Sequence, residues 1–119
     1  MDHQAVEIVA TASLAAVTAN GAGTAILVPP GGFEAAVYVT TTGGPTAANV
    51  TTDLSFDGGT TWTTTFAAAG TVAAGSKTAE TSAVFQLPPG TTHVRHVLAG
   101  LAGGVTPSVT ARPAFRRRF

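Results

Sequence analysis

The sequence predicts an all-β protein: a single antiparallel β-sandwich, jelly-roll-like or immunoglobulin-like, of about eight short strands with extended termini. Three observations predict this class. Apolar and polar residues alternate with a period of two in several segments, β-branched residues are frequent, and Gly- and Pro-rich turn signals recur at regular spacing. A chain of 119 residues is long enough for one hydrophobic core, so we expect one domain over residues 1–119, with flexible arms at 1–4 and 113–119.

The central element is a predicted β-hairpin that turns at Asp57-Gly58-Gly59-Thr60. Alternating apolar residues run into this turn and resume after it, which is typical of half-buried strands. The large apolar residues of the hairpin are expected to point inward and join the two sheets: Leu54, Phe56, Trp62 and Phe66.

The same stretch spells S-x-D-x-G-x-T-W, with the motif positions Ser55, Asp57, Gly59, Thr61 and Trp62. It looks like the Asp-box turn of sialidase-type β-propellers, in which the Asp and Ser side chains bond backbone groups and the Trp packs beneath the turn. The resemblance implies a structural role for these residues. A propeller needs several four-stranded blades, and this chain has one copy of the motif. The alternative is a sugar or Ca²⁺ contact through Asp53 and Asp57.

The other expected strands follow from the same alternation and are separated by turns at 20–23, 29–32 and 88–90. Segment 6–17 suits one long strand or two short ones with a bend, and its Ala content makes a helix the competing interpretation. Residues 67–76 are rich in Ala and Gly, which predicts a mobile loop with one short paired segment. The remaining strands are expected at 24–28, 33–41, 78–87, 93–98 and 106–112.

A turn, strand, loop, strand unit occurs twice. Val28-Pro29-Pro30-Gly31 precedes one strand and a Gly-Gly loop, and Leu87-Pro88-Pro89-Gly90 precedes another strand and a second Gly-Gly loop. We expect one copy of the unit in each sheet; the alternative is a chance match between two low-complexity stretches.

Charged residues make up 10% of the chain, against roughly 25% in ordinary soluble domains. This composition indicates a surface partly covered by neighbouring molecules, although a codon bias towards Ala, Gly and Arg explains part of it. All 6 acids precede residue 81, whereas all the arginines follow residue 94. The predicted partner-binding residues are therefore Arg112, Arg116, Arg117, Arg118 and Phe119. The alternative is a frayed, solvated terminus.

No catalytic, cofactor-binding or metal-binding residues are expected. His93 and His96 are three apart on a strand and point to opposite faces, so they do not chelate one ion. Asp53 and Asp57 would lie about 13 Å apart along a strand, beyond the separations that glycoside hydrolysis uses. We predict that the protein is not an enzyme. Zero net charge and few stacking aromatics disfavour nucleic acid as a partner.

The absence of Cys excludes disulfides, and no apolar stretch approaches the ~20 residues of a transmembrane helix. The apolar run at 5–19 contains Glu7 and has no Lys or Arg before it, so it does not read as a signal peptide. We expect synthesis in the cytoplasm and no membrane partner.

The sequence as a whole is similar to small β-sandwich virion proteins of tailed bacteriophages and prophages. The similarity covers about residues 14–112 and rests on the turn at 14–20, the strand at 35–39, residues 50–62, Leu87-Pro88-Pro89-Gly90, Val94-Arg95 and residues 104–110. It implies a structural part of the virion, first a capsid decoration or minor capsid protein, otherwise a tail or head-to-tail connector protein. The implied partners are capsid or tail proteins, together with other copies of the chain, for example in a trimer. A carbohydrate-binding module of a phage fibre is the alternative from another class.

Overall fold

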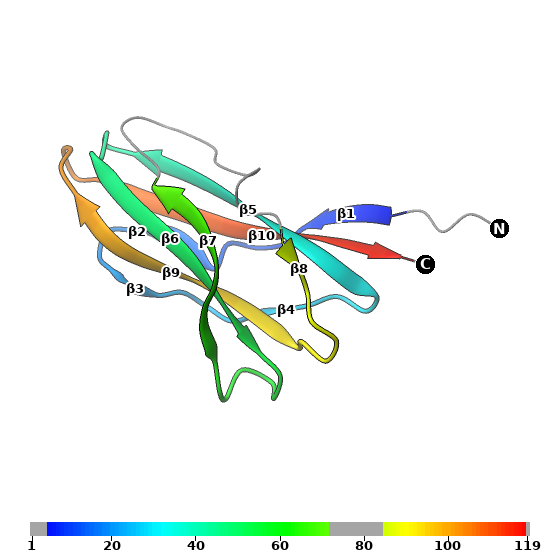
Figure 1. The fold of residues 1–119 in the computed structure, drawn as a ribbon. Helices are drawn as coiled ribbons and strands as arrows, with labels where there is room; N and C mark the ends of the chain where they lie inside the picture. The colour runs from blue at the N-terminus through cyan, green and yellow to red at the C-terminus, as the bar shows by residue number, and fades with distance from the viewer. Residues whose placement is uncertain (1–4, 72–84, 119) are drawn as a thin grey trace.

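The computed structural model describes residues 5–71 and 85–118 and shows an all-β fold in these ranges (Figure 1). The described residues form 10 strands in two antiparallel sheets that face each other as a sandwich. The predicted fold class is therefore confirmed. The arm expected at 1–4, Phe119 and most of the strand expected at 78–87 lie outside the described residues.

Sheet A has the strand order β1-β10-β5-β8, with β2 also pairing with β10. Its strands are β1 (Ala5–Val9), β2 (Leu14–Val17), β5 (Gly32–Thr42), β8 (Phe85–Gln86) and β10 (Ser108–Arg118). The first segment of the chain thus forms two short strands with a break, one of the two strand arrangements that the sequence left open.

Sheet B has the order β3-β9-β6-β7, with β4 also pairing with β9. Its strands are β3 (Gly21–Ala22), β4 (Ile26–Leu27), β6 (Ala47–Ser55), β7 (Thr63–Thr71) and β9 (His93–Ala102). Residues 67–71 belong to β7, so the described part of the expected loop is a paired segment, and residues 72–76 of that loop lie outside the described residues. The paired segment lies against Asn49, Val50, Thr51 and Thr52 of β6, and this backbone pairing holds a segment whose side chains have little volume.

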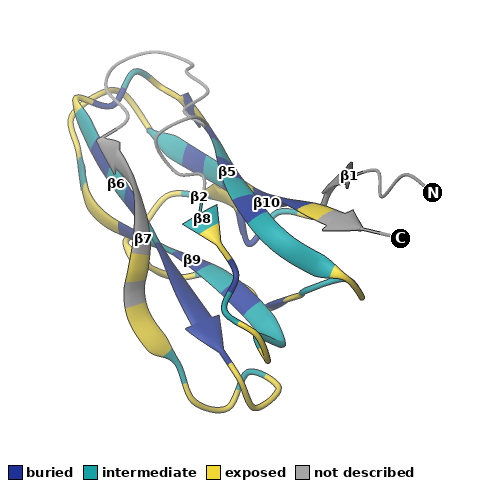
Figure 2. Cartoon of the chain, turned by 45° about the vertical axis from the view of Figure 1, so that its right-hand side comes forward, coloured by how far each residue is buried: buried dark blue, intermediate teal, exposed yellow. Residues whose placement is uncertain are grey.

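The core lies between the four long strands β5, β6, β9 and β10, where buried residues alternate with more exposed ones (Figure 2). Phe115 of β10 is the largest fully buried side chain, and Leu54 of β6 and Val94 of β9 belong to the same buried cluster. A second cluster includes Val39, Val50 and Leu98. The prediction that Leu54 points inward is confirmed.

Each of the two Pro-Pro-Gly units spans both sheets, in the opposite order. After the first turn the chain forms β5 in sheet A and then β6 in sheet B; after the second it forms β9 in sheet B and then β10 in sheet A. Each copy therefore contributes one strand to each sheet, and the expectation of one copy per sheet was wrong. Gly31 and Gly90 both adopt positive φ, at 78° and 91°, because each turn needs a left-handed residue.

The strand register makes the same relationship exact at the residue level. Ile26 of β4 pairs with Val94 of β9, and Phe85 of β8 pairs with Ala35 of β5. The amide of Val28 donates to the carbonyl of Thr92 at 2.9 Å, and the amide of Leu87 donates to that of Phe33 at 2.9 Å. The sandwich is thus a pseudo-two-fold pair of interleaved units, in which Ala35 corresponds to Val94.

Residues 113–118 belong to β10, so the flexible arm expected at 113–119 was wrong over the described part. Pro113 and Phe115 are buried between the sheets, Ala114 is buried on the opposite face of the strand, and the strand pairs with both β1 and β5. Pro113 lacks an N–H group, which normally excludes proline from a central strand. Its carbonyl accepts from the amide of Ala10, in the break between β1 and β2. The side of Pro113 that lacks a donor therefore faces a break in the strand pairing.

Candidate functional site

The loop between β6 and β7 is held by the side chains of Ser55 and Asp57. The Ser55 hydroxyl donates to Asp57 Oδ1 at 2.8 Å and accepts from the amide of Gly59 at 2.8 Å. The amides of Thr60 and Thr61 donate to Asp57 Oδ1 at 3.2 and 2.8 Å. The hydrogen bond from the Thr61 backbone, then those from the Thr61 and Ser55 side chains, lower the pKa of Asp57 to about 2.

Trp62, at the end of this loop, packs against an ion pair on the outer face of sheet B. The Arg95 guanidinium lies 4.3 Å from the centroid of the Trp62 ring, and Arg95 Nε lies 2.9 Å from Asp53 Oδ2. Asp53 is only 2% exposed, although its place on the strand would put it on the solvent side. Arg95 therefore occupies Oδ2 of Asp53, one of the carboxylate oxygens that the alternative sugar or Ca²⁺ contact through Asp53 and Asp57 would use.

The aromatic residues of the hairpin do not all point inward. Phe56 is 47% exposed because β6 ends at Ser55, and the alternation of faces ends with it. Phe66 is 41% exposed at the edge of sheet B, where it makes an edge-to-face contact with Phe85 of sheet A, with ring centroids 5.7 Å apart. Trp62 is half-buried against Arg95. The inward orientation expected for Phe56 and Trp62 was therefore wrong, whereas Phe66 joins the two sheets at their edge through Phe85.

His96 points into the core, while His93 lies on the other face of β9, as the spacing of the two predicts. Nδ1 of His96 lies 3.0 Å from the Thr52 hydroxyl, and Nε2 has no hydrogen-bond partner among the described residues. Burial lowers the pKa of His96 to about 4, against an opposing effect of the Asp53 carboxylate. The alternation of His93 and His96 was the one signal in the sequence that one histidine would be buried.

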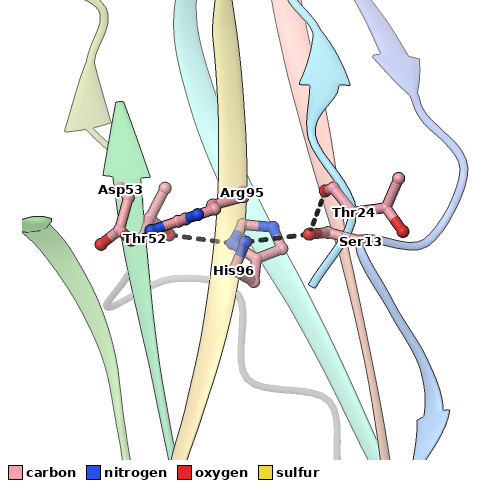
Figure 3. A network of polar contacts seen from close by, with 6 residues as sticks. All are labelled: Ser13, Thr24, Thr52, Asp53, Arg95 and His96. Carbon is pink, nitrogen blue, oxygen red and sulfur yellow. Dashed lines mark hydrogen bonds and ion pairs between the residues drawn. The ribbon is translucent and has the colours of Figure 1, made fainter. Parts of the chain in front are cut away.

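Ser13 joins His96 to the edge of the sandwich (Figure 3). The Ser13 hydroxyl donates to the carbonyl of Thr24 at 2.6 Å and accepts from the amide of His96 at 2.9 Å. The amide of Gly23 donates to the carbonyl of His96 at 2.8 Å. A Cβ on Gly23 would lie 2.2 Å from the carbonyl oxygen of Ser13, so this position requires glycine. These hydrogen bonds between Ser13, Gly23 and His96 were not predicted from the sequence, since neither Ser13 nor Gly23 stands in a recognisable motif.

The predicted partner-binding arginines lie on a rigid strand. Arg112 and Arg116 are exposed and separated by four residues on β10, so they share the outer face of sheet A. Arg116 Nη1 lies 3.6 Å from Glu34 Oε1, in a solvent-exposed ion pair that contributes little stability. Arg117 and Arg118 continue the backbone of β10, and their side chains, like Phe119, lie outside what the structure describes.

Large apolar side chains are exposed at both ends of the sandwich. Leu27 of β4 is 64% exposed, and Phe56 follows the end of β6 close to Gly90. Val105, in the connection between β9 and β10, is 79% exposed. Within residues 5–71 and 85–118 there is no group of three His, Cys, Asp or Glu side chains placed to hold a metal ion. Nor does this part of the chain contain a helix long and apolar enough to cross a membrane.

These features define an antiparallel β-sandwich of two interleaved units with a side-chain-locked hairpin loop. No family model and no curated protein matches the sequence. Among solved structures, the chain is similar to the crystal structure of the SPBc2 prophage-derived protein YomS, with a TM-score of 0.57 and 15% sequence identity. The match covers 98% of this chain and 96% of that one. It shows a shared fold over nearly the full length of both proteins.

Proposed function

We propose that the chain is a non-enzymatic structural component of a tailed-phage particle, bound to the capsid as a decoration or minor capsid protein. The observation that carries the proposal is the shared fold with a prophage-derived protein over 98% of this chain. The virion resemblance of residues 14–112 points the same way. The protein's place of action would be the virion, after synthesis in the host cytoplasm.

The surface chemistry supports a passive building block. Within the described residues each acid whose side chain is placed is already engaged: Glu34 with Arg116, Asp53 with Arg95, and Asp57 with its own turn. Such carboxylates are poorly placed to act as general acids or bases on a substrate. Exposed apolar side chains at opposite ends, Leu27 and Val105, suit a protein that contacts more than one neighbour. Several weak contacts of this kind give stable attachment when they act together.

Arg112 and Arg116 are the described part of the proposed partner-binding face, with Arg117, Arg118 and Phe119 as its continuation along the chain. Arg112 is exposed beside Tyr38 in the β10–β5 register, on an outer face otherwise dominated by Thr and Ala. A guanidinium held on a rigid strand loses less freedom on binding a carboxylate than one on a flexible arm. An acidic face of a capsid or tail subunit is therefore the proposed partner, and nucleic acid is not.

The experiment is to purify particles from the host that encodes the chain and to measure the copy number of the protein by quantitative mass spectrometry. We expect the protein to co-purify at a copy number that is a fixed multiple of the shell symmetry, and to rebind to particles from which it has been removed. Arg112→Glu should weaken rebinding at least ten-fold, whereas Thr64→Glu, at an exposed position of the other sheet, should bind like the natural protein. Absence of the protein from purified particles would contradict the proposal.

A tail or head-to-tail connector protein is the second candidate of the same class, because the shared fold does not distinguish positions in the particle. The carbohydrate-binding alternative has one observation in its favour, the exposed Phe56 ring. Trp62, by contrast, has a ring face covered by Arg95. Glycan-array binding that is lost in Phe56→Ala, with the fold retained, would favour the carbohydrate-binding module over a capsid protein.

A further inference from the structure

One buried polar group in the core is not required by the fold. His96 is 0% exposed, and its Nε2 has no partner in the described part of the chain. Thr52 occupies Nδ1, so whichever nitrogen carries the proton, one polar atom of the neutral ring stays unsatisfied. An unsatisfied buried polar atom destabilises a folded protein, and native structures contain few of them.

The pseudo-two-fold relationship shows that an apolar side chain fits the position equivalent to His96. Since Ala35 corresponds to Val94, the residue that corresponds to His96 is Val37. Val37 faces Pro113 across the β5–β10 pair, just as His96 faces Thr52 across the β9–β6 pair. All four residues are buried. One half of the sandwich therefore packs an apolar pair where the other half holds a histidine and a hydroxyl.

His96 also stands where the edge of the sandwich closes. Its amide donates to the Ser13 hydroxyl, and its carbonyl accepts from the amide of Gly23. The amide of Ser13 donates to the carbonyl of Ala111 on β10, so Ser13 ties sheet A to sheet B. We call residues 13–24 the seam segment. Its backbone position depends on the backbone of β9 at His96.

We propose that His96 is a pH-sensitive switch. The seam segment stays closed while the imidazole is neutral, and protonation of the imidazole opens it. An imidazolium has two N–H donors and a full charge. In the closed structure the Thr52 hydroxyl accepts from one of them, while the Nε2 donor has no acceptor and the charge is buried. Opening of the seam gives water access to the ring and relieves both penalties.

The neighbouring charges do not cancel this penalty. Asp53, on the opposite face of β6, favours the imidazolium, but its carboxylate is bound by Arg95 at 2.9 Å. Arg95 and His93 lie on the other face of β9. The seam segment contains no ionisable residue, and the inward residues of β5 and β10 near the pair are apolar, with Arg112 and Glu34 on the outer face. Burial therefore dominates and holds the pKa of His96 near 4.

The sign of the pH effect follows from this direction. Because the pKa of His96 is lower in the closed state than the ordinary histidine value of 6.5, the closed state is fully favoured above that value and loses its advantage as the pH falls towards 4. The opening equilibrium constant should rise on the order of fifty-fold between pH 7 and pH 4.5. Asp57 titrates lower, from 3.8 towards about 2, so the two effects fall in separate windows.

The test is NMR on the purified protein, with the histidine ring signals followed from pH 8 to pH 3.5. We expect His96 to remain neutral well below pH 6, and the amides of Gly23, Thr24 and His96 to exchange faster at pH 4.5 after correction for intrinsic rates. Amides of β6 and β9 far from the seam should keep their protection. A His96 that titrates near 6.5 with unchanged exchange at the seam would overturn the proposal.

A pair of variants distinguishes the pH-sensitive switch at His96 from a general sensitivity of the fold to acid. His96→Val copies the residue found at the equivalent position 37, and it should abolish the increase in seam exchange between pH 7 and pH 4.5. His93→Val, on the same strand but on the opposite face, is the matched control and should keep the increase. If the seam segment of His96→Val opens in acid as it does in the natural protein, His96 is not the switch. The wild-type titration decides the question even where a variant folds poorly.

Discussion

The guanidinium of Arg95 lies 4.3 Å from the centroid of the Trp62 ring and at the same time binds Asp53 through Nε at 2.9 Å. One arginine on β9 thus anchors both the end of the hairpin loop and a nearly buried carboxylate of β6. This arrangement explains why Asp53 is buried on the outer face of a sheet. It also makes the loop a fixed part of the sandwich.

Removal of the Trp62 ring should expose this ion pair. We expect Trp62→Ala to lower the free energy of unfolding by about 2 to 4 kcal/mol, from the lost cation–π contact and the lost aromatic burial. Urea unfolding followed by circular dichroism is the measurement, since Trp62 is the one Trp of the chain. Phe56→Ala, at a more exposed aromatic of the same loop, should change the free energy by less than about 1 kcal/mol. Equal effects of the two substitutions would show that Trp62 is no more important than a surface ring.

Breaking the ion pair from the Arg95 side should be more harmful than removing both charges. Arg95→Met leaves Asp53 buried without a partner, which should lower the free energy of unfolding by about 3 to 5 kcal/mol. The double variant with Asp53→Asn removes the unpaired charge and should recover at least about 1 kcal/mol of that loss. A double-mutant cycle in urea measures the coupling. Strictly additive losses would mean that the two groups act independently.

Ser55 is the buried residue whose hydroxyl helps to hold the turn between β6 and β7. Ser55→Ala removes an acceptor for the Gly59 amide and a donor to Asp57, and should lower the free energy of unfolding by about 1 to 3 kcal/mol. Thr60→Ala, which leaves the backbone bond to Asp57 in place, is the matched control and should have a small effect. Thermal unfolding of both variants is sufficient. A Ser55→Ala protein as stable as Thr60→Ala would remove the hydroxyl from the account.

The hydrogen bonds to Asp57 also predict a pH effect. The pKa of Asp57 is lowered from 3.8 to about 2, so the ionised carboxylate stabilises the turn above 3.8, and this contribution is lost as the pH falls through 2. Asp57→Asn should therefore unfold with a weaker pH dependence between pH 4 and pH 2 than the natural protein. An unchanged acid profile of the variant would contradict the assignment.

The C-terminal strand should be essential to the fold. Phe115 is fully buried in one of the two core clusters, and residues 113–118 pair with β5 and β1. Phe115→Ala should lower the free energy of unfolding by about 3 to 5 kcal/mol, and a chain truncated before residue 113 should not fold. A soluble truncated protein with the native amide spectrum would show that β10 is dispensable beyond Arg112. Because residues 116–118 are part of β10, deletion of 116–119 tests the fold as well as binding, and substitution of the arginines is the better test of partner binding.

Much of the architecture could be predicted because local patterns dictate it. The period-two alternation around Leu54 and the turn residues around Gly31 and Gly90 set strands and turns directly. The end of the chain was mispredicted for a physical reason: Pro113 and a run of arginines are typical of a loop, and only the gap between β1 and β2 makes proline acceptable in that central strand. Burial of Asp53 depends on Trp62 and Arg95, which meet only in three dimensions. The seam at Ser13 and His96 joins residues far apart in the chain, which no local pattern reports.

Electron cryo-microscopy of particles purified from the encoding host is the decisive test of whether the protein is a structural part of a phage particle, as we propose. We expect density that fits this two-sheet sandwich at repeated positions on the shell, with the outer face of sheet A, around Arg112, turned towards an acidic subunit surface. Complete shells and tails in which every density is assigned to other proteins would contradict it.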